Sequence, residues 1–358
     1  AEGGGLRAAR VVVGDGGGAP PGGRDAVSAF TAGGTENHMV WDRRAAPFME
    51  VWYATVTHRR LRSGLWLRYT ISAPRQGDPS CALWAFYFDP DNKRSFAGRN
   101  DHPIDVLGHV PGRDDGALVR ICDAWLSETH LDGRVALAGR TLAWSLDVEP
   151  ADRCYQHLPR WLRARAAQRF STLCSPNLSV PVSGTVEVDG EPIHFDREPG
   201  CQSHRWGRRH SHSWAWAHCA SWGGDEPAVF EGLAAKAAAA LPPLTFLYLR
   251  NRGEDLVFGT LRARSRFALP GWDFTARNGR WKIAGAARFA VDATVQVRYA
   301  DPDGGERHCA NSEIADLSIE LYERAGRTWR PAASLVSKGA AHFELGRPTA
   351  FGAIPVAF

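Results

Sequence analysis

The residues best suited to chemistry crowd into one segment, between positions 194 and 231. Six metal-ligating side chains lie within 19 residues of it: Cys201, His204, His210, His212, His218 and Cys219. On a strand, His210 and His212 would face the same side and could share a zinc or iron ion. The spacing matches no zinc finger, and no carboxylate completes a facial triad, so we assign no metal site. A metal-dependent enzyme using His210 and His212 is kept as the weaker alternative.

Nucleophilic catalysis has less support in the same segment. The chain contains no Gly-x-Ser-x-Gly motif, and no cysteine stands in a protease-like context. Ser203 and His204 are adjacent, but neighbouring strand residues point to opposite faces and cannot form a triad. Acid–base or carbocation chemistry in an aromatic cavity is the hypothesis that remains.

Tryptophan and histidine alternate with small residues along Ser213–Trp222, which predicts a strand with one aromatic face. The side chains expected on that face are Trp214, Trp216, His218 and Trp222. A tryptophan face stabilises a developing carbocation by about 2 kcal/mol or more once water is excluded. A buried Glu231, or an imidazole such as His204 or His218, could deliver the proton. The competing interpretation is that the tryptophans pack a core and that His218 bonds to the backbone.

Short strands separated by turns make up the elements that must position these residues. The strands expected first are Glu50–Thr57, Gly64–Ile71, Ser80–Phe88, Ala117–Leu126 and Thr141–Val148. A second series begins near residue 211, and its regular spacing favours an antiparallel meander closed into a barrel. Residues 156–170 are predicted to form one helix that plugs a barrel end, with a membrane-surface helix as the alternative.

Composition and charge narrow the class of protein further. The 358 residues are 44% hydrophobic and 23% charged, as in ordinary globular proteins, and 14 of them are Trp. No 18-residue apolar run is present, so no membrane-spanning helix is predicted, and transient surface contact is the membrane interaction left open. A net charge of +4, spread along the chain, argues against nucleic-acid binding. Seven cysteines and a glycine-rich, flexible segment 1–25 without a signal-peptide core indicate a cytoplasmic protein.

Several of these motifs resemble one family. Glu50-Val-Trp-Tyr, Gly64-Leu-Trp-Leu-Arg-Tyr-Thr, Ser183-Gly-Thr-Val-Glu-Val-Asp-Gly, Gly200-Cys-Gln-Ser-His-Arg-Trp-Gly and the Trp-Ala-Trp strand are similar to the carotenoid 1,2-hydratase (hydroxyneurosporene synthase) and AttH-like lipocalin-fold family. Tocopherol cyclases and lipocalin-like Diels–Alderases are its distant relatives. The resemblance runs from about residue 48 to the C-terminus. It implies two consecutive lipocalin-like barrels with an apolar ligand pocket near their junction.

The resemblance also implies a type of chemistry and two of its residues. His204 and Trp206 occupy the positions of the family's His-x-Trp pair on a Gly-flanked loop. An acidic residue often precedes that histidine in the family, and here it is Ser203, which shifts the acid role to Glu231, Asp196 or His204. The reactions implied need no cofactor: alkene hydration, prenyl cyclisation or a templated pericyclic reaction.

The sequence thus predicts an all-β protein of two antiparallel lipocalin-like barrels, spanning 26–207 and 208–358, with one short helix. The favoured function is a cofactor-independent hydratase (a hydro-lyase) or intramolecular cyclase acting on a hydrophobic, isoprenoid-like molecule. We expect His204, Trp206 and Glu231 to be catalytic. The ligand-binding residues expected are Gln202, Trp214, Trp216, His218 and Trp222. A non-catalytic carrier of hydrophobic ligands on the same fold is the alternative.

Overall fold

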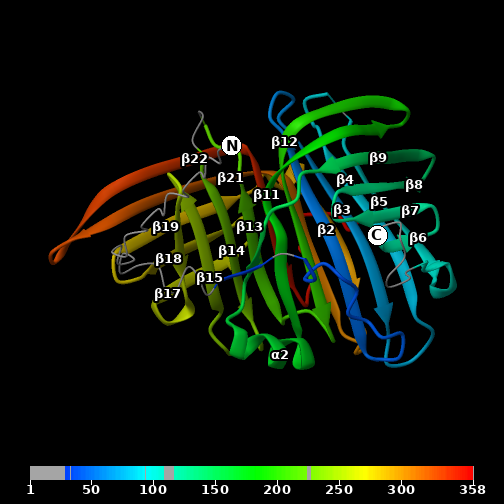
Figure 1. Cartoon of the computed structure of the whole chain (residues 1–358), viewed down its shortest axis with the longest axis horizontal. Helices are drawn as coiled ribbons and strands as arrows, with labels where there is room; N and C mark the ends of the chain where they lie inside the picture. The colour runs from blue at the N-terminus through cyan, green and yellow to red at the C-terminus, as the bar shows by residue number, and fades with distance from the viewer. Residues whose placement is uncertain (1–28, 33, 93, 109–116, 224–226, 358) are drawn as a thin grey trace, which may run out of the picture.

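The computed structural model describes residues 29–32, 34–92, 94–108, 117–223 and 227–357. Most of this part of the chain is β-structure, arranged as two antiparallel sheets side by side (Figure 1). The predicted all-β fold with one short α-helix is therefore confirmed for the residues described. The glycine-rich segment 1–25 lies outside them.

The first sheet is built by the N-terminal part of the chain. Its strands are β1 (Phe30–Ala32), β2 (Phe48–His58), β3 (Ser63–Ala73), β4 (Ser80–Phe88), β5 (Phe96–Pro103), β6 (Ala117–Ile121), β7 (Ala124–Ser127), β8 (His130–Leu137), β9 (Arg140–Val148), β10 (Arg153–Gln156), β11 (Ser171–Val188) and β12 (Glu191–Gly207). Their main order is β5-β4-β3-β2-β12-β11-β9-β8-β7-β6. The sheet curls until β5 meets β8, where the Asn100 side chain donates to the Ala136 carbonyl oxygen at 2.8 Å. A barrel with its own apolar core results.

The second sheet follows without a long linker. Its strands are β13 (Ser213–Cys219), β14 (Val229–Lys236), β15 (Leu244–Asn251), β16 (Glu254–Phe258), β17 (Ala263–Ala268), β18 (Gly271–Arg277), β19 (Trp281–Arg288), β20 (Val295–Ala300), β21 (Glu306–Ala325) and β22 (Thr328–Arg347). The main order is β16-β15-β14-β13-β22-β21-β19-β18-β17, and β20 pairs with β21. This sheet also curls, since the Thr245 hydroxyl of β15 donates to that of Ser265 on β17 at 2.9 Å. It encloses a second core, and the β21–β22 hairpin reaches well beyond the other strands (Figure 1).

A third apolar core joins the two barrels. Its buried side chains include Trp66, Trp84, Phe86, Trp214, Trp216 and Tyr299. The first three come from β3 and β4 of the first barrel, and the others come from β13 and β20 of the second. Trp66 and Phe86 stack with their ring centroids 4.6 Å apart. Strand β3 is consequently buried on both faces, one against its own barrel and one against the neighbour.

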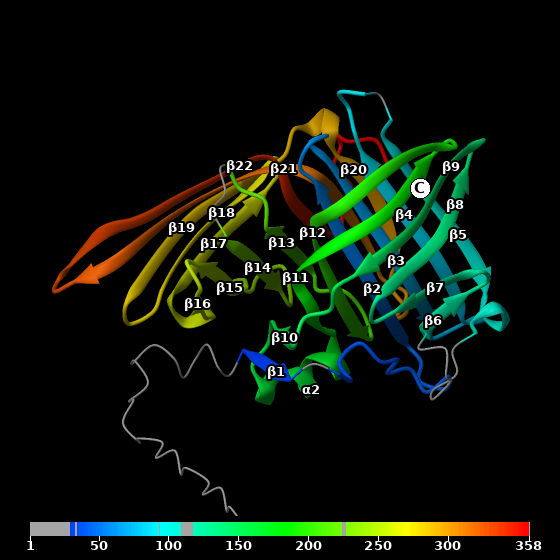
Figure 2. The same ribbon diagram turned by 45° about the horizontal axis from the view of Figure 1, so that its top comes forward.

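Two expected elements differ from the structure. The strand predicted at 117–126 is a hairpin of β6 and β7, because Cys122 adopts a left-handed conformation with φ 53° and turns the chain. The predicted helix exists as α2 (Arg160–Arg169), but it packs on β11 and β12 beside the meeting point of the barrels and does not plug a barrel end (Figure 2). Within the described residues, no helix is long and apolar enough to cross a membrane. Single 3-10 turns form at Ile104–Val106, Thr260–Arg262 and Val291–Ala293.

The approach of the two barrels is close enough to require a glycine. Strand β3 passes β21 at Gly64, where a Cβ atom would collide with the Cβ and the carbonyl oxygen of Glu313. We expect Gly64→Ala to lower the free energy of unfolding by about 1–3 kcal/mol, the usual cost of overpacking. Urea unfolding followed by tryptophan fluorescence measures this change. Gly259→Ala is the control, because a Cβ at Gly259 meets no atom within 4 Å. Equal stability of the two variants would contradict the tight junction.

Candidate functional site

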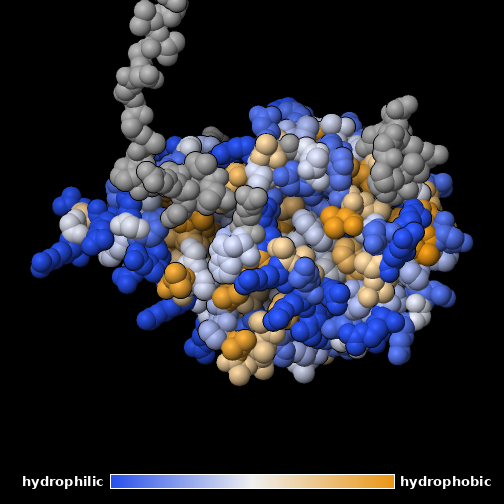
Figure 3. Space-filling view, turned by 60° about the horizontal axis from the view of Figure 1, so that its bottom comes forward, coloured by the Kyte–Doolittle hydropathy of each residue, from blue (hydrophilic) through white to orange (hydrophobic). Residues whose placement is uncertain are grey.

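A cavity of about 570 Å³ lies between the two barrels. Strands β2, β3, β11 and β12 of the first barrel and β13, β14, β15, β20 and β22 of the second form its walls, and α2 covers one side. Its apolar lining includes Leu158, Leu162, Leu173, Leu233 and Phe246. Its polar lining includes Tyr53, Arg68, Arg205 and Glu344. The face of the molecule on the α2 side shows apolar patches among hydrophilic ones (Figure 3).

Cross-strand pairing arranges the second barrel's side of the junction in three rows. The first row is Gly346, Trp214, Ala235 and Leu244; the second is Glu344, Trp216, Leu233 and Phe246; the third is His342, His218, Glu231 and Tyr248. Side chains of the first two rows line the cavity. The third row is buried next to them and forms a polar layer. Gly346 is required here because a Cβ would collide with the indole of Trp214.

The predicted aromatic face of the tryptophan strand is confirmed for part of its length. Trp214, Trp216 and His218 share one face of β13, and the first two line the cavity. Trp222 does not belong to this face, because β13 ends at Cys219 and the alternation ends with it. Its indole packs in the second barrel's own core and donates to the Ala228 carbonyl oxygen at 2.8 Å.

Glu231 is fully buried behind the cavity wall. Its Oε1 atom accepts a hydrogen bond from the Trp216 indole at 2.6 Å and pairs with Nε2 of His157 at 2.5 Å. Its Oε2 atom has no hydrogen-bond partner among the described residues. Glu231 therefore fixes the orientation of a tryptophan that lines the cavity. His157, which precedes α2, carries no sequence signal that distinguishes it from an ordinary polar loop residue.

Glu344 is a functional candidate that the sequence did not reveal. It lines the cavity directly opposite Trp216 in the β22–β13 register. Burial raises the pKa of the Glu344 carboxyl, nearby Glu313 raises it further, and Arg68 acts in the opposite sense. Asn311 donates to its Oε1 atom at 3.2 Å. Along its strand, Glu344 alternates with apolar residues. A strand with one face in water shows the same alternation, so the sequence did not reveal that Glu344 lines a cavity.

Four arginines line the cavity: Arg68 and Arg205 come from the first barrel, and Arg165 and Arg169 come from α2. The Arg68 guanidinium lies over the ring of Tyr299 with its carbon 4.6 Å from the ring centroid, and over Trp84 at 5.0 Å. Arg205 lines the cavity and donates to the Ser171 hydroxyl through Nε at 3.0 Å. Leucine and phenylalanine side chains share the lining with these arginines, so the cavity suits a largely apolar molecule that carries one polar group.

Three predicted site residues lie on the other face of strand β12. The segment expected to be a loop is part of this strand, so successive side chains point in opposite directions. Cys201 and Arg205 face the junction, whereas Gln202, His204 and Trp206 do not line the cavity. Both imidazole nitrogens of His204 already have hydrogen-bond partners in the first barrel.

The neighbours of these three residues belong to the first barrel. His204 Nε2 pairs with Glu50 Oε1 at 2.9 Å, and His204 Nδ1 donates to the Glu36 carbonyl oxygen at 2.6 Å. The Trp206 ring lies 4.7 Å from the His204 ring. The Gln202 carbonyl oxygen accepts from the Asn177 amide at 2.6 Å.

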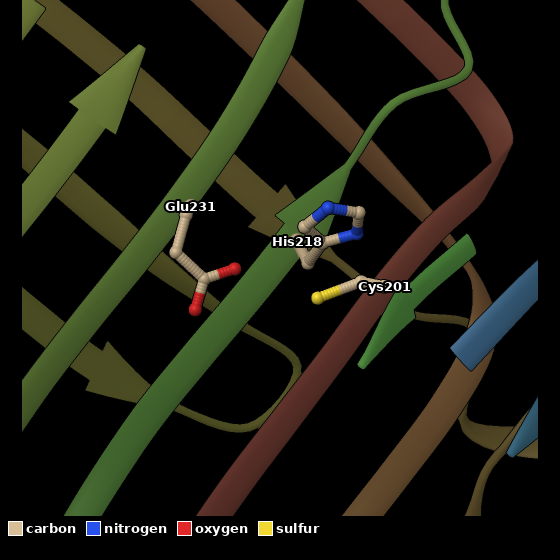
Figure 4. A group of neighbouring side chains, drawn as sticks. All are labelled: Cys201, His218 and Glu231. Atoms are coloured by element: carbon tan, nitrogen blue, oxygen red, sulfur yellow. The ribbon is translucent and has the colours of Figure 1, made fainter. Parts of the chain in front are cut away.

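The possible metal ligands are distributed differently from the sequence hypothesis. His210 Nδ1 pairs with Asp301 Oδ1 at 2.5 Å, and neither His210 nor His212 belongs to a set of three ligands among the described residues. The set that the described structure does bring together is Cys201, His218 and Glu231, each offering one ligand atom within 4.8 Å of the others (Figure 4). All three side chains are buried.

Residues 136–347, more than half of the chain, match the tocopherol cyclase-like family. The chain belongs to the tocopherol cyclase-like family. The Ser183–Gly190 and Gly200–Gly207 motifs and the tryptophan strand all fall within the matched stretch. The family relationship expected from these motifs is therefore confirmed.

One sequence relative and two solved structures are similar to this tocopherol cyclase-like chain. The uncharacterized protein Rv0493c of Mycobacterium tuberculosis (strain H37Rv) is 30% identical over 323 residues, which cover 87% of this chain and 90% of the relative. Kievitone hydratase from Nectria haematococca superimposes with a TM-score of 0.51 at 8% identity, covering 90% of this chain and 94% of that one. The protein CghA gives 0.52 at 11% identity, covering 89% and 93%. At such low identity these two structures show a shared fold.

The buried His210 makes the free energy of unfolding of the protein depend on pH. Burial, with the charge of Arg205 adding to it, lowers the pKa of His210 from 6.5 to about 3. Below pH 6.5 the unfolded chain therefore binds a proton that the folded protein excludes, and stability falls as the pH drops. We expect the stability advantage of the wild type over His210→Asn to shrink from pH 7 to pH 4, by at most roughly 1.4 kcal/mol per pH unit. Urea unfolding across this range tests the prediction, and parallel curves would contradict it.

Proposed function

We propose that this protein is a hydratase or cyclase that protonates a carbon–carbon double bond of a hydrophobic, isoprenoid-like molecule in the cavity between its barrels. The observation that carries the proposal is the place of Glu344, a carboxyl group of raised pKa on an aromatic cavity wall. Membership of the tocopherol cyclase-like family supports cyclase-type chemistry. The shared fold with a protein named kievitone hydratase supports hydration as the related outcome.

The cavity has the properties of a small-molecule site. Its volume of about 570 Å³ lies within the range of roughly 300–1,000 Å³ found for ligand pockets. Leucine and phenylalanine side chains from α2, β14 and β15 favour an apolar chain. Arg68 and Arg205 offer donors for one polar end of the ligand. An amphiphilic isoprenoid would place its polar group against Arg68 or Arg205 and its apolar chain against the leucines and Phe246.

The proposed first step is proton transfer from Glu344. With its pKa raised by burial, a larger fraction of Glu344 is protonated near neutral pH than of an exposed glutamate. The carboxyl O–H bond breaks, and the alkene π pair forms a C–H bond at the less substituted carbon. A carbocation is left at the more substituted carbon, and Glu344 becomes a carboxylate. Arg68, which already lowers the pKa of Glu344, stabilises that carboxylate.

The aromatic wall stabilises the cation formed in this step. Trp214 and Trp216 line the cavity near Glu344, and an indole π face attracts positive charge by about 2 kcal/mol when desolvated. In a hydratase, the oxygen of a water molecule bonds to the cation. In a cyclase, a hydroxyl group or double bond of the same substrate does so. The proton lost after the attack returns to the Glu344 carboxylate, so the acid is regenerated.

The sequence-predicted residues take different parts in this proposal. Glu231 becomes a positioning residue, since its carboxylate holds the Trp216 indole by a 2.6 Å hydrogen bond. His204 and Trp206, on the opposite face of β12, are left out of the chemical step. His218 lies in the polar layer next to the cavity wall and makes a hydrogen bond to the Leu178 backbone.

The proposal predicts a large loss of activity in Glu344→Gln. A panel of prenyl alcohols and polyenes is incubated with the protein in deuterated water, and products are separated by liquid chromatography and mass spectrometry. A hydrated product gains one water in which one hydrogen is a carbon-bound deuterium, whereas a cyclised isomer keeps the composition of the substrate with one hydrogen replaced by deuterium. We expect Glu344→Gln to lower the rate by about 100- to 10,000-fold, the usual contribution of a general acid.

The control is Glu320→Gln, an exposed glutamate on β21 that should leave the rate unchanged. Binding is followed separately by quenching of tryptophan fluorescence with retinol as the probe. Turnover by Glu344→Gln at the wild-type rate would refute the assigned acid. Quenching by wild-type protein without a product from any member of the panel would instead favour a carrier of hydrophobic ligands.

A further inference from the structure

We propose that Cys201, His218 and Glu231 bind a zinc ion that fastens the two barrels together. One ligand atom from each of these buried side chains lies within 4.8 Å of the other two. They come from β12, β13 and β14, and Figure 4 shows the three side chains pointing into a common space. The site is separate from the Glu344 carboxyl and does not depend on the proposed reaction.

Two of the three side chains present an unused acceptor. The Nε2 atom of His218 donates to the Leu178 carbonyl oxygen at 2.9 Å, so in the neutral imidazole the lone pair is on Nδ1. That Nδ1 atom is buried and has no hydrogen-bond partner among the described residues. The same holds for Oε2 of Glu231. Buried acceptors without donors are costly, and an ion placed between them removes the cost for both.

The third ligand completes a set suited to zinc. Zinc accepts sulfur, nitrogen and oxygen ligands, and thiolate, imidazole and carboxylate together offer all three, with a water molecule in the fourth position of the tetrahedron. Binding deprotonates the Cys201 thiol, whose proton passes to solvent, so a divalent ion faces one thiolate and one carboxylate and the site is neutral. Bond lengths near 2.0–2.3 Å require the ligand atoms to approach to about 3.5 Å, a modest contraction from the separations present.

Neighbouring groups already hold the ligands in place. His157 and the Trp216 indole both bond to Oε1 of Glu231, which leaves Oε2 for the ion. The Leu178 carbonyl fixes the tautomer of His218. Such partners are a regular feature of zinc sites, where they orient the ligands and strengthen binding. These contacts distinguish the set from a chance meeting of surface side chains.

The expected consequence of zinc binding is a tighter junction. Cys201 belongs to the first barrel, whereas His218 and Glu231 belong to the second. An ion bound to all three therefore crosslinks the barrels beside the cavity, and it stabilises the folded state by an amount that rises with the logarithm of the free zinc concentration above the dissociation constant. A thermal unfolding midpoint that rises with zinc concentration is the predicted sign.

Cobalt(II) provides a spectroscopic test that does not involve catalysis. The purified full chain is treated with a chelator, dialysed and titrated with cobalt chloride, and bound cobalt is displaced with zinc chloride. We expect one equivalent of cobalt to give the visible bands of a tetrahedral site and a near-ultraviolet thiolate charge-transfer band. Cys201→Ser should abolish the charge-transfer band. It should also weaken binding by more than about 100-fold, beyond the 10- to 100-fold cost of losing an outer partner.

Cys219→Ser is the matched control. Cys219 follows His218 on β13 but faces the core of the second barrel, so this variant should keep the band and the zinc-dependent rise in melting temperature. Should circular dichroism show that Cys201→Ser is unfolded, Glu231→Gln replaces it, and the visible bands must then weaken. The proposal is overturned by a wild-type chain that takes up no cobalt or zinc, or by a charge-transfer band that persists in folded Cys201→Ser.

Discussion

The burial of two barrel surfaces against each other is the constraint on which the rest of this structure depends. A free-standing antiparallel barrel leaves its outer face to water, and polar side chains there need no protein partner. Here Trp66 and Trp84 of one barrel meet Trp214 and Trp216 of the other and exclude that water. Charged groups on the same faces must then be satisfied within the protein or carry a perturbed pKa.

The polar layer and the cavity are two results of this one constraint. Glu344 on β22 and Glu231 on β14 flank strand β13, one row apart, yet their surroundings differ. Glu344 borders open space and has an arginine and an amide beside it, which suits a group that gives and recovers a proton. Glu231 is enclosed and is held by an indole and an imidazole, which suits a fixed support. Environment, and not residue type, separates the two roles.

The sequence predicted the elements well and the site only in part. Strand β4 occupies the expected residues Ser80–Phe88, because alternating aromatic residues ended by Asp89-Pro90 mark a strand unambiguously. The face of Trp214 and Trp216 also followed from alternation. The face of β12 did not, because the choice between Cys201 and Gln202 depends on which side meets the other barrel. That information arises from contacts between residues more than a hundred positions apart, such as Thr57 and His342.

Double burial of β3 also bears on how this molecule can change over evolutionary time. The first sheet ends at Gly207 and the second begins at Ser213, so the topology suggests two separable modules. Strand β3 nevertheless packs one face against its own barrel and the other against the second barrel. Separating the two barrels would expose the apolar side chains of both to water. A substitution at the junction in one barrel must therefore fit the surface of the other, so the two barrels are expected to evolve together.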